Sequence, residues 1–161
     1  MNYLDFIASK IYTIETIKPL LSVWRFKQEK IVFTNGCFDI IHLGHIDYLS
    51  KAAALGTRLV LGLNSDESIR RLKGETRPVI AQESRVLTLA SMIFIDAVIV
   101  FNEDTPYDLI SIVQPDILVK GGDYKKEDIV GYDIVKNKGG EIITIDLVQG
   151  YSTTTLINKQ R

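Results

Sequence analysis

The chain has 161 residues, of which 46% are hydrophobic and 24% charged, and its formal net charge is -1 at pH 7. This length suits a single domain, and the composition is close to the average of globular proteins, which excludes disordered and fibrous classes. The small net charge argues against nucleic acid as a partner. No apolar run reaches the roughly 18 residues of a membrane span, and no signal-peptide pattern is visible, so we expect a cytoplasmic protein without membrane contact.

Residues 1–29 are predicted to form an N-terminal helical extension. Apolar residues recur at helical spacing over positions 4–11, and a second apolar stripe covers positions 17–24. Such a stripe can serve a subunit interface or pack on its own domain, and we expect the second. A homodimer is nevertheless the expected assembly.

From residue 30 onward, short β-branched runs alternate with helically spaced apolar residues, a pattern that predicts a parallel sheet covered by helices. Nearly continuous apolar runs at 59–61 and 98–100 are typical of strands buried on both faces. We therefore predict an α/β domain over residues 30–161, with a Rossmann-like, doubly wound sheet of five parallel strands. The predicted strands span 30–34, 58–63, 97–101, 117–120 and 141–145, and the predicted crossover helices include 46–53 and 86–90.

The segment from Thr34 to His45 leaves the first predicted strand and enters the first crossover helix. In open parallel sheets, ligands bind at this carboxyl edge. Gly36 permits close approach of backbone amides to a phosphate, and Gly44 lets an anion lie near the helix start. His42 and His45 are three positions apart, so both imidazoles could face the same phosphate.

These two histidines are the only ones in the chain. A lone histidine is usually a capping or core residue, but two in one glycine-bearing turn favour a catalytic role. A zinc site is poorly supported, because only Asp39 could join the two imidazoles as a ligand. Cys37, the only cysteine, is expected to line the turn, since no base is dedicated to a nucleophile or redox sensor there.

Two later segments carry polar groups to the same edge. Asn64 closes the second predicted strand, and Ser65 or Asp66 would cap the following helix, which leaves Asn64 to face a ligand. Lys73 begins a polar segment, residues 73–78, that is predicted to be a mobile loop over the site. For Lys73 itself, a solvated surface lysine is the ordinary interpretation.

Two glycine-containing turns follow the last two predicted strands. Lys120 and Gly121 open a turn that ends at Asp123, where paired glycines would let a flat base lie against the backbone; ordinary turn chemistry is the alternative. Residues 150–154 precede the last predicted helix. There Ser152 or Thr153 would cap the helix, and its hydroxyls and amides would bind a triphosphate.

Together these motifs resemble the cytidylyltransferase-like nucleotidyltransferases, whose signature is Phe-Asp, two further residues, and His-x-Gly-His. From about Lys10 to the end, the chain is similar to the branch that makes ADP-heptose from a heptose 1-phosphate, in bacteria usually one domain of a bifunctional kinase-adenylyltransferase. The matching motifs are Phe38-Asp39, His42-Leu43-Gly44-His45, Asn64-Ser65-Asp66, Arg71-Leu72-Lys73-Gly74, Arg77-Pro78-Val79, Glu103-Asp104-Thr105-Pro106, Val119-Lys120-Gly121-Gly122-Asp123-Tyr124 and Gly150-Tyr151-Ser152-Thr153-Thr154.

The resemblance implies transfer of AMP from ATP to a sugar 1-phosphate, giving ADP-heptose and pyrophosphate for lipopolysaccharide core synthesis. It implies Mg²⁺ bound mainly through the ATP phosphates, no metal ligand from the protein, and a separate sugar kinase that supplies the substrate. His42, His45 and Lys73 would be the catalytic residues. The implied nucleotide-binding residues are Thr34, Asn35, Gly36, Cys37, Phe38, Gly44, Asn64, Lys120, Gly121, Asp123, Gly150, Ser152, Thr153 and Thr154.

One departure from the superfamily bears on the nucleotide. Cytidylyltransferases typically read Arg-Thr-Glu-Gly-Ile-Ser-Thr-Thr at the last motif, whereas this chain has Leu147 in place of the arginine. That difference favours ATP over CTP. The alternatives are the same fold acting on another phosphate acceptor, as a glycerol-3-phosphate cytidylyltransferase or an FMN adenylyltransferase, and a noncatalytic nucleotide-binding sensor.

Overall fold

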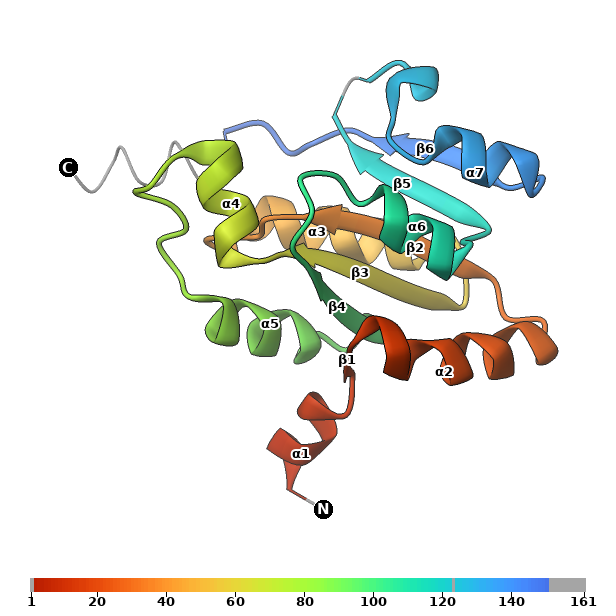
Figure 1. The fold of residues 1–161 in the computed structure, drawn as a ribbon, viewed down its shortest axis with the longest axis horizontal. Helices are drawn as coiled ribbons and strands as arrows, with labels where there is room; N and C mark the ends of the chain where they lie inside the picture. The colour runs from red at the N-terminus through yellow and green to blue at the C-terminus, as the bar shows by residue number, and fades with distance from the viewer. Residues whose placement is uncertain (1, 123, 151–161) are drawn as a thin grey trace.

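The computed structural model describes residues 2–122 and 124–150, so Asp123, Ser152, Thr153 and Thr154 of the predicted site lie outside the described residues. An α/β fold with a parallel sheet is confirmed, in the order β1-β4-β3-β2-β5-β6 (Figure 1). The prediction of five strands is wrong, because the sheet has six. The strands are β1 (Ile11–Tyr12), β2 (Ile31–Gly36), β3 (Arg58–Asn64), β4 (Ala97–Phe101), β5 (Ile117–Gly121) and β6 (Glu141–Ile145). The helices are α1 (Tyr3–Ala8), α2 (Ile14–Phe26), α3 (Leu43–Ala53), α4 (Asp66–Lys73), α5 (Gln82–Ala90), α6 (Tyr107–Val113), α7 (Tyr132–Asn137) and the 3-10 turn η1 (Lys126–Asp128).

The sixth strand comes from the predicted N-terminal extension. Ile11 and Tyr12 pair in parallel with Val98 and Ile99 of β4, at one edge of the sheet. Thr13 then caps α2 in a capping box with Thr16. The Thr13 hydroxyl oxygen accepts from the Thr16 backbone N–H, and the Thr16 hydroxyl oxygen accepts from the Thr13 backbone N–H. Two residues are too few to show the alternation that marks a strand, and Ile11 continued the helical spacing of the preceding apolar residues.

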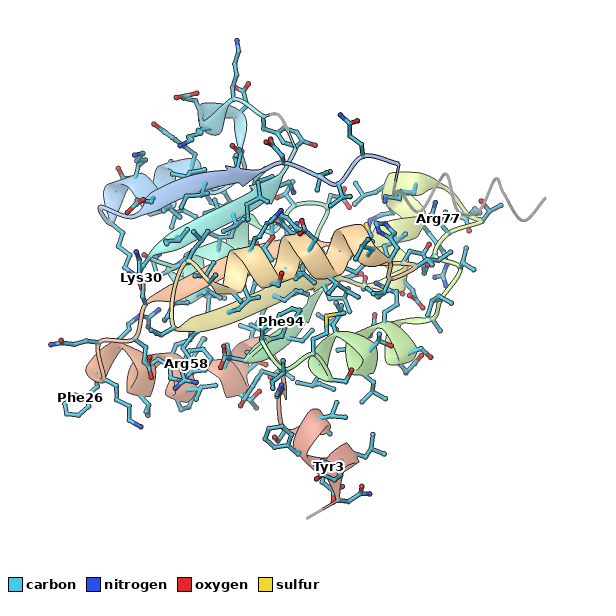
Figure 2. The ribbon with its side chains drawn as sticks, turned by 180° about the vertical axis from the view of Figure 1, so that it is seen from behind. Tyr3, Phe26, Lys30, Arg58, Arg77 and Phe94 are labelled. Carbon is cyan, nitrogen blue, oxygen red and sulfur yellow. The ribbon has the colours of Figure 1, made fainter. Side chains whose placement is uncertain are left out.

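Two apolar layers enclose the sheet. In β2, Phe33 packs with the cluster under α2, α6 and α7, whereas its neighbour Val32 packs with the cluster under α3 and α5. The same division of helices between the two faces is visible from opposite sides in Figures 1 and 2. Ile17, Leu21 and Trp24 of α2 are buried in the first of these clusters. The apolar stripe of α2 therefore packs on its own domain.

The strand order places a ligand crevice at β2. Successive strands β3 and β4 extend the sheet on one side of β2, whereas β5 and β6 extend it on the other. Such a reversal leaves the carboxyl ends of two neighbouring strands, here β2 and β5, open between helices that cover opposite faces. The segment that carries His42 and His45, residues 37–45, follows β2 directly and is called the histidine turn below. In the part of the chain that the structure describes, no helix is long and apolar enough to cross a bilayer.

Candidate active site

The histidine turn connects β2 to α3. His42 occupies the N-cap position of α3 with an extended backbone, but its side chain makes no capping hydrogen bond. His45, in the first turn of the helix, stacks on His42 with ring centroids 3.8 Å apart and planes inclined by 24°. The Phe38 ring completes the group in an edge-to-face arrangement, with its centroid 5.2 Å from that of His45. The two imidazoles thus act as one unit at the positive end of the α3 dipole.

The surroundings lower the pKa of both imidazoles. Burial lowers the pKa of His45 to about 4, and the positive charges of His42 and Lys73 add to that shift, while the Ile40 carbonyl opposes it. Burial also lowers the pKa of His42 below its ordinary value. A bound phosphate would reverse these effects, because a nearby anion favours the protonated form.

A buried carboxylate stands three residues before His42. The side chain of Asp39 is 1% exposed and accepts the Nε hydrogen of Arg77 at 2.7 Å. The backbone N–H groups of Val79 and Ile80 also donate to it, at 2.8 and 2.9 Å. Burial acts to raise the pKa of Asp39, but these donors together lower it below its ordinary value. Asp39 is therefore an anchor for the segment that joins α4 to α5.

A fully buried arginine lies beneath the same turn. The side chain of Arg85 is 0% exposed, and it pairs with the Asp66 carboxylate at 2.7 Å. It also donates to the carbonyl oxygens of Cys37, Asn64 and Ile80, at 2.7, 3.0 and 3.0 Å. One guanidinium thus joins the carboxyl ends of β2 and β3 to the segment between α4 and α5.

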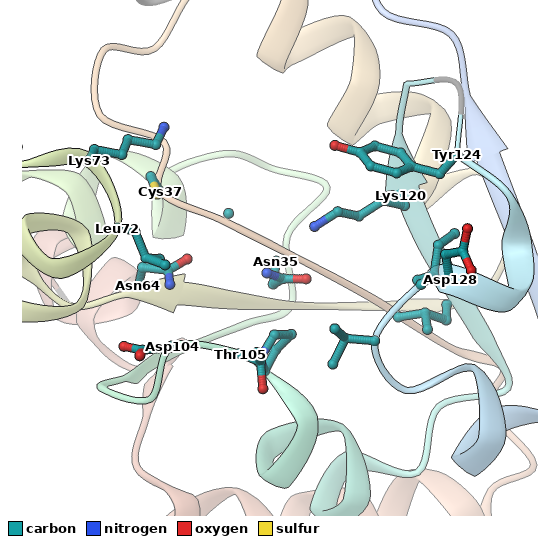
Figure 3. Close-up of a pocket in the computed structure, with 15 residues that line it drawn as sticks. Asn35, Cys37, Asn64, Leu72, Lys73, Asp104, Thr105, Lys120, Tyr124 and Asp128 are labelled. Carbon is teal, nitrogen blue, oxygen red and sulfur yellow. The ribbon is translucent and has the colours of Figure 1, made fainter.

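Two cavities open on either side of the end of β2. The smaller, of about 190 Å³, is lined by His45 together with Phe38, Asp39 and Gly121. The larger, of about 520 Å³, lies toward β3, α6 and η1 and is shown in Figure 3. The residues that line both cavities are Asn35, Gly36, Cys37, Lys73 and Lys120.

Two lysines approach the junction of these cavities. Lys73 is the last residue of α4 and is followed by Gly74 in a left-handed conformation, φ 94°, so its predicted position in a loop is wrong. Lys120 comes from β5, and burial lowers its pKa, with a smaller opposing contribution from Cys37. In Figure 3 the two ammonium groups extend toward one another from opposite sides. Together they bring two basic side chains to the junction.

The other predicted site residues differ in their surroundings. Thr34 is buried, with its hydroxyl 2.6 Å from that of Tyr48, so its side chain supports the core beneath the site. Asn64 lines the larger cavity and donates to Ser68 at 3.0 Å. Ser65 caps α4, as one reading of the sequence predicted. A β-carbon on Gly121 would lie 2.8 Å from the end of the Leu147 side chain, which would have to shift to admit it.

The chain belongs to the cytidylyltransferase-like family, whose sequence pattern matches residues 33–158. It is 54% identical over 151 residues to the bifunctional protein HldE of Syntrophotalea carbinolica, and 49% identical over 150 residues to that of Wolinella succinogenes. These alignments cover 94% and 93% of the chain but only 31% of each relative, so the chain spans about a third of their length.

Solved structures show the same fold. A lipopolysaccharide core biosynthesis protein from Thermoplasma volcanium superposes with a TM-score of 0.61 at 26% identity, over 77% of this chain and 99% of that one. A pantoate-beta-alanine ligase from Francisella tularensis has a TM-score of 0.61 at 16% identity, over 91% of this chain and 75% of that one. The second similarity concerns the fold alone.

Proposed function

We propose that the chain transfers AMP from ATP to a heptose 1-phosphate, giving ADP-heptose and pyrophosphate. The observation that carries this proposal is the stacked pair of His42 and His45, of which His45 lines the smaller cavity together with Lys73 and Lys120. The two lysines also line the larger cavity. The similarity to bifunctional HldE proteins and to a lipopolysaccharide core biosynthesis protein supports the choice of substrate.

The two cavities divide between the two substrates. The smaller one would take the α-phosphate and the base end of the nucleotide, because it lies against His45 and ends at Gly121, where the resemblance implies the nucleobase. The rest of the nucleotide would extend toward Asn64 in the larger cavity. The larger one would take the sugar, because hydroxyl-binding groups of Asp104, Thr105 and Asp128 line its far side. Both phosphates would then meet at the shared lysines.

The reaction is an in-line displacement at phosphorus. An oxygen of the sugar phosphate forms a bond to the α-phosphorus of ATP. The bond between the α-phosphorus and the oxygen that bridges the α- and β-phosphates breaks, and pyrophosphate leaves with that oxygen. The attacking oxygen is already ionised near neutral pH, so no residue needs to remove a proton. His42, His45 and Lys73 stabilise the charge that develops on the transferring group.

Mg²⁺ fits this arrangement as an ion carried by the nucleotide. Among residues 2–122 and 124–150, no group of three or more His, Cys, Asp or Glu side chains is placed to hold a metal. Mg²⁺ is commonly bound through substrate phosphates and water with few protein ligands, so the triphosphate itself would hold the ion. The ion would supply charge neutralisation on the triphosphate.

We also propose that a separate kinase makes the phosphorylated sugar and that the chain forms a homodimer. The phosphate at the anomeric carbon of the acceptor would be the group that this kinase adds. Light scattering at several concentrations tests the dimer, and a constant monomer mass would contradict it.

The central test is a product analysis. The protein is incubated with ATP or CTP and a panel of acceptors: both anomers of heptose 1-phosphate, glycerol 3-phosphate and FMN. We expect pyrophosphate release and an ADP-sugar mass only with ATP and a heptose 1-phosphate. Pyrophosphate at background level with every pair would contradict an enzymatic function, and a preference for another acceptor would replace the substrate.

A further inference from the structure

We infer that Asp39 is a positioning residue, which fixes Lys73 relative to the histidine turn through the segment that joins α4 to α5. The inference rests on the proposed function, because it assigns Asp39 an effect on the transfer step through Lys73. Asp39 and Lys73 line the smaller cavity together with His45. They reach it from different elements, 34 positions apart in the sequence.

The segment between the two helices is not held by apolar packing. The side chains of Val79 and Ile80 are 53% and 37% exposed, so little of the core reaches them. Their backbone is instead bound from beneath, where both N–H groups donate to Asp39 and the Ile80 carbonyl accepts from Arg85. Polar contacts at buried groups therefore set the position of this segment.

These contacts continue to Lys73 through a short turn. Arg77 donates its Nε hydrogen to Asp39, and its backbone N–H donates to the Gly74 carbonyl at 3.1 Å. Gly74 in turn donates to the Arg70 carbonyl at 2.8 Å and ends α4 just after Lys73. A continuous set of hydrogen bonds thus joins Asp39 to the end of the helix that carries Lys73.

The positioning role of Asp39 depends on its negative charge. An ionised carboxylate accepts from all three donors at once, whereas the neutral amide of asparagine must turn its NH₂ group toward one of them. The side chain keeps its size, but the segment loses a charge-assisted bond to Arg77. A displacement of about 1 Å at a group that stabilises the transition state can lower turnover by as much as a hundredfold.

A comparable carboxylate at the amino ends of the strands supplies a control. Asp96 accepts the backbone N–H of Leu59 at 2.8 Å and an Nη hydrogen of Arg58 at 3.0 Å. This combination also pairs an arginine with a backbone donor, although Asp96 has one such donor where Asp39 has two and its side chain is 26% exposed. It lies at the amino ends of the strands. Figure 2 shows Arg58 at the opposite end of the sheet from Arg77. Asp96→Asn reports what such a change does to stability alone.

A double-mutant cycle tests the inference with the full chain. Turnover and Michaelis constants are measured for the parent, Asp39→Asn, Lys73→Ala and the double variant, well below each melting temperature. We expect Asp39→Asn to lower kcat by about tenfold to a hundredfold. In the double variant, the loss should exceed that of Lys73→Ala by less than about threefold, because residues that act together are not additive. Asp96→Asn should keep the parental kcat.

Two results would overturn the inference: a folded Asp39→Asn with parental kcat, or losses that multiply in the double variant. If Asp39→Asn does not fold, the same cycle with Arg77→Gln decides, since that change breaks the side-chain bond and leaves both backbone donors on Asp39. A parent chain without adenylyl transfer to any acceptor refutes the proposed function. An active parent with multiplicative losses refutes only the role of Asp39.

Discussion

The imidazoles of His42 and His45 stack at 3.8 Å, so that protonation of one raises the cost of protonation of the other. Burial already keeps both pKa values low. An anion that faces both rings relieves this repulsion. We therefore expect the pKa values of the pair to rise when phosphate binds.

Removal of either imidazole should lower turnover strongly. We expect His42→Ala and His45→Ala each to reduce kcat by roughly a hundredfold or more, the loss typical when a preorganised donor to developing charge is removed. Circular dichroism should show that both variants fold. Turnover within about threefold of the parent in either folded variant would remove that histidine from the mechanism.

The low pKa of His45 predicts a loss of stability in acid. In the unfolded chain His45 binds a proton near its ordinary pKa of 6.5, whereas in the folded protein it does so only at about 4. The unfolded state therefore gains protons first, and stability falls as the pH drops from about 6.5 to 4. His45→Asn should show a smaller change in Tm between pH 7 and pH 5 than the parent. An equal change in both proteins would contradict the assignment.

Nucleotide binding should raise the same pKa. An NMR titration of the histidine ring signals, with and without a nonhydrolysable ATP analogue and Mg²⁺, measures this directly. We expect the midpoint of His45 to move upward from about 4 when the analogue is bound. An unchanged midpoint would mean that the phosphates do not face this ring.

Lys73 should affect activity without affecting stability. It ends α4 and is exposed, so Lys73→Ala should change the free energy of unfolding by no more than about 0.5 kcal/mol. Turnover should fall and the Michaelis constant should rise, because the ammonium group binds phosphate in both the ground and the transition state. Lys73→Arg should restore part of the activity, since the guanidinium keeps the charge but not its compact shape. Parental kinetics in Lys73→Ala would return it to an ordinary surface lysine.

Arg85 should affect stability most. Arg85→Met leaves the Asp66 carboxylate and three carbonyls without their donor, and we expect a loss of about 3 kcal/mol or more in the free energy of unfolding. For a chain of this size the fall in Tm would be roughly 10 °C. The exposed pair of Arg71 and Asp104 provides the comparison, and Arg71→Met should cost less than about 1 kcal/mol. Similar Tm values for the two variants would contradict this account.

The sequence was informative where a pattern repeats or a motif is contiguous. β4 and β6 begin and end at the predicted residues, because β-branched runs with clear ends are a strong signal. β1 was not predicted, because a strand of two residues is too short to show the alternation of apolar and polar residues. Lys73 was assigned to a loop because its polar neighbours obscured the last turn of α4.

The buried contacts of Arg85 and Asp39 could not be predicted from the sequence, because they join segments that are far apart in the chain. Arg85 and Asp39 are 46 positions apart, and neither position indicates locally that the two side chains hold the same segment: Arg85 lies in an amphipathic helix, and Asp39 lies in a signature motif between a strand and a helix. Their burial depends on how the segment between α4 and α5 folds back onto the end of β2. The one available signal was a charged residue directly before the apolar positions of the predicted helix at 86–90.

Because Lys73 and Lys120 line both cavities, a single molecule with a polyphosphate bridge could occupy the whole site. A compound that links adenosine to a sugar in this way would bind its second half at a high effective concentration. ADP-heptose, the proposed product, has this shape itself. We therefore expect product inhibition, with the nucleotide sugar released more slowly than pyrophosphate. We also expect analogues that combine both substrates in one molecule to inhibit this site.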